Sequence, residues 1–170
     1  MKQTLRHKAD AGFTLIELVV VIAILAILAA FALPRFADMA DEAHRSSVEG
    51  SGGAMAAAVA LARSQWLANG NAVAVINLPG YGDETIDTSV DGWPTGVNGN
   101  TNPDAMSNTE CRDLWIKLLQ SSAPSVSTGT GSDYQASIVG GDCRYTYQRD
   151  SFGNYVQYDP NNGEVFTQIN

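Results

Sequence analysis

The chain has 170 residues and a formal net charge of −8 at pH 7; 45% of the residues are hydrophobic and only 16% are charged. This length accommodates one globular domain and an additional segment. The acidic balance argues against a nucleic-acid-binding protein, which needs positive charge opposite the phosphates. No His/Cys cluster has the spacing of zinc ligands, and no phosphate-binding glycine loop follows a predicted strand, so we expect no metal and no cofactor.

Residues 1–12 are predicted to be a leader peptide that takes no part in the fold. Basic side chains favour a cytoplasmic location for this segment, namely Lys2, Arg6 and Lys8. The leader holds three basic residues and one acidic residue, so its removal leaves 7 basic and 17 acidic side chains and a net charge of −10. The remaining chain is therefore even more acidic than the precursor.

An apolar segment of 21 residues, 13–33, lies between Gly12 and Pro34, and its one charged residue is Glu17. At about 1.5 Å per residue, a helix of this length spans roughly 30 Å, the thickness of a hydrocarbon core. Only a helix satisfies its own backbone hydrogen bonds in lipid here. Residues 13–34 are therefore predicted to form the membrane-spanning half of a long helix.

Glu17 is a functional candidate, because a charged group in lipid costs roughly 2.5–3.5 kcal/mol. A first alternative is that Glu17 lies near the membrane interface and reaches water. A second alternative is an ordinary secretory signal, since Ala30-Phe31-Ala32 is similar to a small-residue cleavage site. The apolar segment is long for such a signal, and it contains a carboxylate.

After Pro34 the helix is expected to kink and continue as an amphipathic half over residues 35–69. Apolar or small residues recur there at steps of four and three and predict one face that packs on a sheet: Val48, Gly52, Met55, Val59, Ala62 and Trp66. Three glycines, Gly50, Gly52 and Gly53, indicate close packing or, alternatively, a local break. Asn69-Gly70 is a C-terminal signal that ends the helix.

Residues 71–106 hold only weak structural signals, among which residues 72–78 are a strand candidate and Pro79-Gly80 marks a turn. An acidic stretch covers residues 83–91, with Asp83, Glu84, Asp87 and Asp91. Hard cations favour carboxylates, so a calcium site is one interpretation. The stretch lacks EF-hand spacing, and a solvated loop is the preferred interpretation.

Ser107-Asn108-Thr109-Glu110 is a capping box and predicts a short helix over residues 108–120. Its apolar residues follow the helical pattern of one buried face: Cys111, Leu114, Trp115, Leu118 and Leu119. Trp115 is interpreted as a core residue rather than a ligand-binding one. Residues 121–132 are rich in Ser, Thr and Gly and predict a loop.

The C-terminal part is predicted to be an antiparallel sheet over residues 134–168, within a globular head of residues 70–170. Four strand candidates alternate with turn signals: 134–139, 143–148, 154–158 and 164–167. The two cysteines, Cys111 and Cys143, are an even count, which in an exported chain predicts a disulfide. This bond would tie the short helix to the sheet and contribute roughly 3–4 kcal/mol.

The sequence shows no convincing set of catalytic residues. His44 is the only histidine outside the leader and lies in a charged stretch, so we expect it to be solvated. The serines have no evident base partner in a G-x-S-x-G setting. The protein is therefore predicted not to be an enzyme.

The segment Gly12-Phe13-Thr14-Leu15-Ile16-Glu17-Leu18 resembles the processing motif of type IV pilins and of the pseudopilins of type II secretion. Pro34-Arg35-Phe36 also resembles this family. The resemblance implies that a membrane prepilin peptidase cuts between Gly12 and Phe13 and methylates the new amine of Phe13. It further implies that Glu17 attracts the amine of a neighbouring subunit during assembly.

The same resemblance implies an α+β lollipop, in which a long N-terminal helix packs on a C-terminal antiparallel sheet. The Cys-x-x-Leu-Trp helix looks most like the mannose-sensitive haemagglutinin group of pilins. The implied function is a structural subunit of a type IV pilus used for adhesion, attachment or surface motility. The implied partners are copies of itself, the peptidase, membrane lipid, and the inner-membrane assembly platform with its ATPase.

Such a subunit would reside in the bacterial inner membrane before assembly and in an extracellular pilus afterwards. One alternative is a pseudopilin that forms the periplasmic piston of a type II secretion system. The other is a soluble exported binding domain that is released after Ala32.

Overall fold

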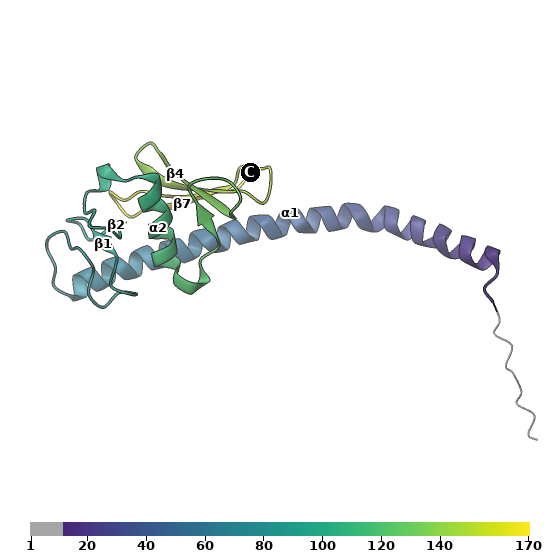
Figure 1. Cartoon of the computed structure of the whole chain (residues 1–170), viewed down its shortest axis with the longest axis horizontal. Coiled ribbons are helices and arrows are strands. Elements are labelled where there is room, and N and C mark those ends of the chain that lie inside the picture. Colours follow the sequence, from purple (N-terminus) through teal and green to yellow (C-terminus); the bar gives the residue numbers. More distant parts are fainter. Residues whose placement is uncertain (1–11) are drawn as a thin grey trace, which may run out of the picture. The chain divides into compact units, whose positions relative to one another are not determined.

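The computed structural model describes residues 12–170 (Figure 1). The predicted leader up to residue 11 lies outside the described residues. Contacts divide the chain into two units, Met1–Ala40 and Asp41–Asn170, and the second unit holds all the described strands.

The helix α1 (Leu15–Ala68) is the longest element and runs through Pro34. The prediction that the proline does not end the helix is confirmed, whereas the kink stays a prediction. α1 ends where Gly70 adopts a φ of +69°, a left-handed conformation that glycine tolerates without strain. The C-terminal signal at Asn69-Gly70 therefore acts as expected.

The part of α1 within the second unit buries one face. All six positions predicted for this face are buried: Val48, Gly52, Met55, Val59, Ala62 and Trp66. Of the three glycines, only Gly52 is a close-packing point, because a Cβ there would collide with the hydroxyl of Thr167 and lie 3.3 Å from its Cβ. A Cβ at Gly50 or Gly53 would meet nothing within 4 Å.

A five-stranded sheet has the order β3 (Val126–Ser127), β4 (Tyr134–Val139), β5 (Asp142–Tyr147), β6 (Tyr155–Tyr158) and β7 (Val165–Gln168). β4 to β7 form the predicted antiparallel meander. β3 was not predicted; it pairs in parallel with β4 inside the expected loop. Alternate residues of β5 are buried, and this face contacts both helices, so the architecture is α+β with helices on one face of the sheet.

The connection between α1 and the short helix is more ordered than its composition suggests. It contains the hairpin β1 (Asp87–Thr88) and β2 (Pro94–Gly96), followed by the 3-10 turn η1 (Pro103–Ala105). The expected strand at residues 72–78 is wrong, because this segment contributes only a single bridge between Val75 and Thr88.

Asp87 organises this connection. Its side chain is fully buried and accepts hydrogen bonds from the backbone N–H of Asn77 and of Gly99. A buried carboxylate that fastens two distant backbone segments holds the loop in place, and no local sequence pattern reveals such contacts.

The short helix α2 (Asn108–Leu119) begins with the predicted capping box, in which Ser107 and Glu110 bond reciprocally. It is followed by the 3-10 turn η2 (Gln120–Ser122). Trp115 is fully buried, and its ring centroid lies 4.7 Å from that of Tyr134 and 4.5 Å from that of Tyr145. The interpretation of Trp115 as a core residue is confirmed.

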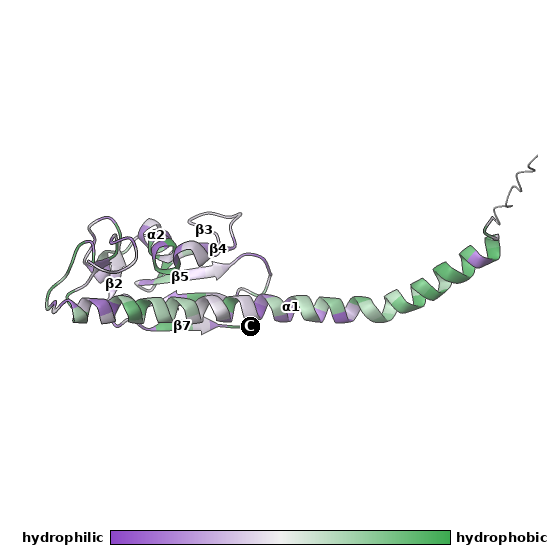
Figure 2. Ribbon diagram, turned by 90° about the horizontal axis from the view of Figure 1, so that it is seen from below, coloured by the Kyte–Doolittle hydropathy of each residue, from purple (hydrophilic) through white to green (hydrophobic). Residues whose placement is uncertain are grey.

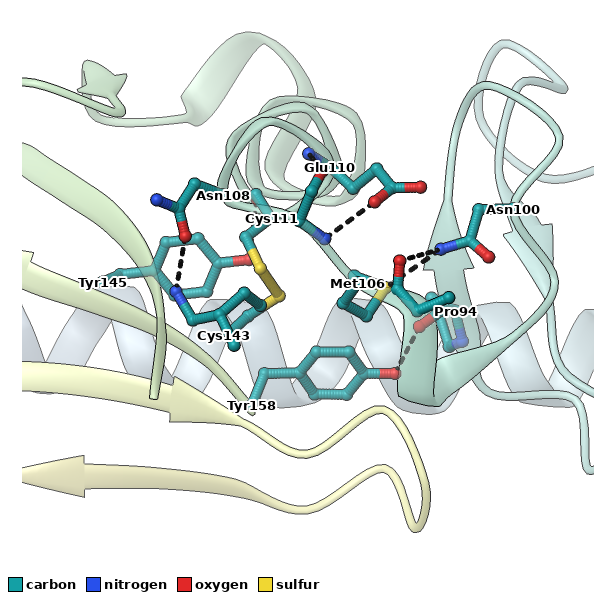
Figure 3. The surroundings of a disulfide bond; sticks show 12 residues. Pro94, Asn100, Met106, Asn108, Glu110, Cys111, Cys143, Tyr145 and Tyr158 are labelled. Atoms are coloured by element: carbon teal, nitrogen blue, oxygen red, sulfur yellow. Dashed lines mark hydrogen bonds between the residues drawn. A yellow bond between two sulfur atoms is a disulfide. The ribbon is translucent and has the colours of Figure 1, made fainter. Parts of the chain in front are cut away.

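A disulfide joins Cys111 of α2 to Cys143 of β5 (Figure 3). Both sulfur-bearing side chains are fully buried, and the hydroxyl of Tyr145 donates a hydrogen bond of 2.8 Å to the carbonyl of Cys111. Asn108 accepts a hydrogen bond from the backbone N–H of Ile138 beside it. The covalent link therefore reinforces an existing contact between α2 and the sheet.

His44 is not solvated as expected. Its side chain is half-buried, and Nδ1 lies 2.9 Å from the hydroxyl of Tyr147 at the end of β5. The charged stretch around His44 did not reveal this contact, because the partner lies 103 positions away in the sequence. The histidine thus helps to dock α1 on the sheet within the second unit.

The contact of Gly52 with Thr167 gives a matched test of packing. Gly52→Ala should lower the free energy of unfolding of the second unit by about 1–3 kcal/mol, because the Thr167 hydroxyl must rotate away and its Cβ would still lie 3.3 Å from the added methyl group. Gly53→Ala, one residue away in open space, should raise it by up to about 1 kcal/mol, because alanine favours the helix.

Urea unfolding of the full chain in non-ionic detergent, followed by tryptophan fluorescence, measures both effects. All three tryptophans lie in the second unit. Equal stability of the two variants would contradict the packing interpretation of Gly52.

The buried tyrosines give a test based on pH. Burial raises the pKa of Tyr134 to about 12, although the side-chain hydrogen bond with Ser51 opposes the rise by favouring the phenolate. Because the unfolded chain ionises near pH 10, this residue stabilises the fold fully below pH 10, and the contribution is lost as the pH rises towards 12. The expected loss from this one residue is about 1.4 kcal/mol per pH unit.

Tyr134→Phe should lower stability at pH 8 by about 1 kcal/mol, because the hydrogen bond is lost. Between pH 10 and pH 12 its stability should then fall less steeply than that of the unsubstituted chain. Urea unfolding at a series of pH values measures the two slopes, and identical slopes would exclude the effect of burial on Tyr134.

Candidate functional site

The peptide bond between Gly12 and Phe13 is accessible. Gly12, Phe13 and Thr14 precede the first residue of α1, and 86% of the Phe13 surface is exposed. A Cβ at Gly12 would meet nothing within 4 Å in the described chain. An exposed, non-helical segment is the form in which a peptide bond is open to cleavage.

A capping box starts α1. The Oγ1 of Thr14 accepts a hydrogen bond of 3.3 Å from the backbone N–H of Glu17. In return, Oε2 of Glu17 accepts hydrogen bonds from the backbone N–H and the hydroxyl of Thr14, at 2.9 and 2.7 Å. The carboxylate therefore satisfies groups that the helix N-terminus leaves without partners.

The sequence analysis missed the role of Thr14. The pattern Thr-x-x-Glu before an apolar run is the same signal that predicted the start of α2 at Ser107. The same signal in residues 14–17 indicates the start of α1.

The first part of α1 is exposed and, apart from Glu17 near its start, apolar (Figure 2). Its most apolar stretch of 18 residues has a mean hydropathy of 3.0, and none of these residues is buried. A helix that is hydrophobic on all sides and has no protein around it suits a lipid environment or a bundle of like helices. Length and composition thus agree with a membrane span.

Glu17 lies among apolar side chains. Together with Phe13, Ile16, Val20 and Val21 it lines a hollow of about 340 Å³ on the surface of α1. Both hydrogen bonds that its side chain accepts use Oε2. In an apolar environment the charge on this carboxylate needs a cationic partner in addition to the capping bonds.

The acidic residues of the connection do not converge. Asp83 pairs with Lys117, and the hydrogen bond from Lys117, together with one from Thr85, lowers the pKa of Asp83. Glu84 accepts a hydrogen bond from the backbone N–H of Gly80, and Asp87 is committed to the backbone as described above. Within residues 12–170, no group of three or more His, Cys, Asp or Glu side chains is placed to hold a metal ion.

The comparisons with known proteins agree with the geometry at this end of the chain. Residues 7–33 match the model of the prokaryotic N-terminal methylation motif, a range that includes Gly12, Phe13 and Glu17. Neither a curated protein nor a solved structure matches the chain. The match supports membership of the pilin and pseudopilin family and covers only the N-terminal segment.

The capping box can be tested apart from any assembly. Thr14→Ala removes the acceptor for the Glu17 N–H and should destabilise the first turn of α1 by about 1 kcal/mol. Thr14→Ser keeps the hydroxyl and serves as the control. Amide hydrogen exchange of Glu17 and Leu18, whose N–H groups bond to Thr14, should be about fivefold faster in the alanine variant than in the serine variant, measured on the full chain in detergent micelles. Equal exchange rates would show that the box does not stabilise the helix start.

Proposed function

We propose that this protein is a structural subunit of a type IV pilus filament used for adhesion, attachment or surface motility. The observation that carries the proposal is the coincidence of the methylation motif with an exposed apolar helix that bears a single carboxylate in its first turn. A subunit that first resides in a membrane and then joins a bundle of like helices needs both features.

Processing is the first step of the proposed pathway. The prepilin peptidase cuts between Gly12 and Phe13 and methylates the new amine of Phe13. The exposed, non-helical backbone at this point supports such a cut, because the enzyme meets no packed structure around Gly12. The leader stays on the cytoplasmic side, and residues 13–34 hold the subunit in the inner membrane.

Assembly follows through Glu17, whose carboxylate pairs with the Phe13 amine of a neighbouring subunit. Two unit charges 4 Å apart attract by about 4 kcal/mol at an effective dielectric near 20. The capping box supports this pairing, since it holds one carboxylate oxygen in place and thus restricts the side chain before the neighbour arrives. The pair then fixes the axial offset between subunits, and the assembly platform with its ATPase drives the addition.

Release of a soluble domain after Ala32 is less compatible with the geometry. Ala30-Phe31-Ala32 lies inside α1, and a peptidase acts on an extended backbone rather than on a helix. A pseudopilin of a type II secretion system would share the processing motif and the carboxylate. Only the place where the filament acts, on the cell surface or in the periplasm, therefore distinguishes a pilin from a pseudopilin.

The charge of Glu17 and its capping role can be separated by substitution. Glu17→Gln keeps an oxygen acceptor for the box but removes the charge, so processing and the helix start should be preserved while assembly fails. Thr14→Ala removes the box but keeps the charge, so filaments should form at nearly normal yield. Filament yield is measured by comparing the amount of subunit in sheared surface material and in membranes of each variant, alongside a processing assay. We expect at least a tenfold loss of filaments for Glu17→Gln and about a twofold change for Thr14→Ala.

Normal filaments from Glu17→Gln would contradict the charge-pairing role. A tenfold loss in Thr14→Ala instead would assign assembly to the cap. Deletion of the gene distinguishes the two classes of filament: loss of long surface filaments in electron micrographs supports a pilin, and loss of enzyme export without such filaments supports a pseudopilin.

A further inference from the structure

The outer face of the sheet, opposite the helices, carries a shallow hollow of about 280 Å³. Its floor is a row of three side chains on adjacent strands, Arg144 of β5, Gln157 of β6 and Phe166 of β7, which are paired in register. Tyr155 flanks this row on one side, and three carboxylates flank it on the other: Asp142, Asp159 and Glu164. The hollow therefore combines aromatic, cationic, amide and acidic groups within one small area.

The polar groups on the floor hold one another in place. Arg144 donates from Nε to Oε1 of Gln157 at 2.9 Å, and Gln157 donates from Nε2 to Oδ2 of Asp142 at 2.5 Å. The guanidinium also lies over the ring of Tyr155, 4.2 Å from its centroid. Because the bond to Gln157 uses Nε, both Nη groups of Arg144 remain as donors for a further partner.

The aromatic residues give the hollow an apolar wall. The ring centroids of Tyr155 and Phe166 lie 6.3 Å apart with an interplanar angle of 56°. Phe166 is 48% exposed, although it belongs to an ordered strand and contacts the tyrosine. An exposed aromatic face beside fixed polar groups is a common composition for a small-molecule site.

The mixture of groups restricts the class of ligand. Three carboxylates would repel an anion and only one guanidinium would attract it. A simple cation would be repelled by Arg144 at the centre of the floor. Within residues 12–170, no carboxylate forms an ion pair with Arg144, so the Nη donors of Arg144 are not taken up by the acidic groups beside them. A sugar ring satisfies both sets, because its hydroxyls donate to carboxylates and accept from a guanidinium while its C–H face packs on an aromatic ring.

We propose that this hollow on β5, β6 and β7 binds a neutral hexopyranose unit, with the ring against Phe166 and the hydroxyls bonded to Glu164, Asp142 and Arg144. The volume lies near the lower limit of small-molecule sites, about 300 Å³, which suits one sugar unit at a time. This site is independent of Glu17 and of filament assembly, so either proposal can fail without the other.

Ligand-observed saturation-transfer NMR tests the site with the full chain in a detergent that contains no sugar. The probes are glucose, galactose, mannose and N-acetylglucosamine, each at up to about 20 mM. We expect at least one of them to bind with a Kd of about 1 mM, independently of salt because the ligand is neutral.

Two variants and one control locate the binding. Phe166→Ala removes the apolar wall, and Glu164→Gln removes one charged acceptor from an exposed position without a change of size; each should weaken binding at least tenfold. Val90→Ala, an exposed apolar residue outside the hollow, should leave it unchanged. Unchanged circular dichroism of the variants shows that the sheet is intact.

Absence of binding by all four sugars overturns the proposal, as does binding that survives both Phe166→Ala and Glu164→Gln. Binding of a cationic probe, arginine amide, that is lost in high salt while the sugars fail would also overturn it and would mark the hollow as a docking site for basic side chains.

Discussion

The carboxylate of Glu17 is the interaction on which the account of this protein depends. It lies in the first turn of an apolar helix, where it both completes the helix start with Thr14 and introduces the one charge of the segment. Capping alone would not require an ionised group, because a glutamine serves the same box. The charge is costly in lipid, so it favours any arrangement that supplies a cation, and the proposed cut after Gly12 creates one at Phe13. In the proposed pathway, one side chain thus links processing, membrane residence and assembly.

The two parts of α1 differ in which side chains they bury. Its first part exposes apolar side chains on all sides, whereas its second part buries a single face against the sheet, with Gly52 permitting the closest approach. The second unit is stabilised by contacts that do not involve the first part of α1: the disulfide between Cys111 and Cys143, and buried tyrosines whose hydroxyls bond to backbone carbonyls. The outer face of the sheet is left free of helices, which is where the proposed sugar site lies.

The sequence predicted the features that depend on local pattern. The buried face of α1, the capping box of α2 and the four strands of the meander follow from periodicity and turn signals, and the structure confirms them. Several misses involve contacts that no local pattern shows. The contacts of His44 with Tyr147 and of Asp87 with Gly99, and the parallel pairing of β3, leave no local signal. Thr14 differs, because Thr-x-x-Glu is a local capping-box pattern that the sequence itself contains.

The mature N-terminus is the most direct test of the central claim, that the chain is processed after Gly12 and enters a filament through its apolar helix. Mass spectrometry of the protein purified from its native membranes and surface material identifies this terminus and its modification. The account predicts a chain that begins at Phe13 with one methyl group on its amine. A chain that begins at Leu33, or one that retains Met1 in the surface fraction, would contradict it.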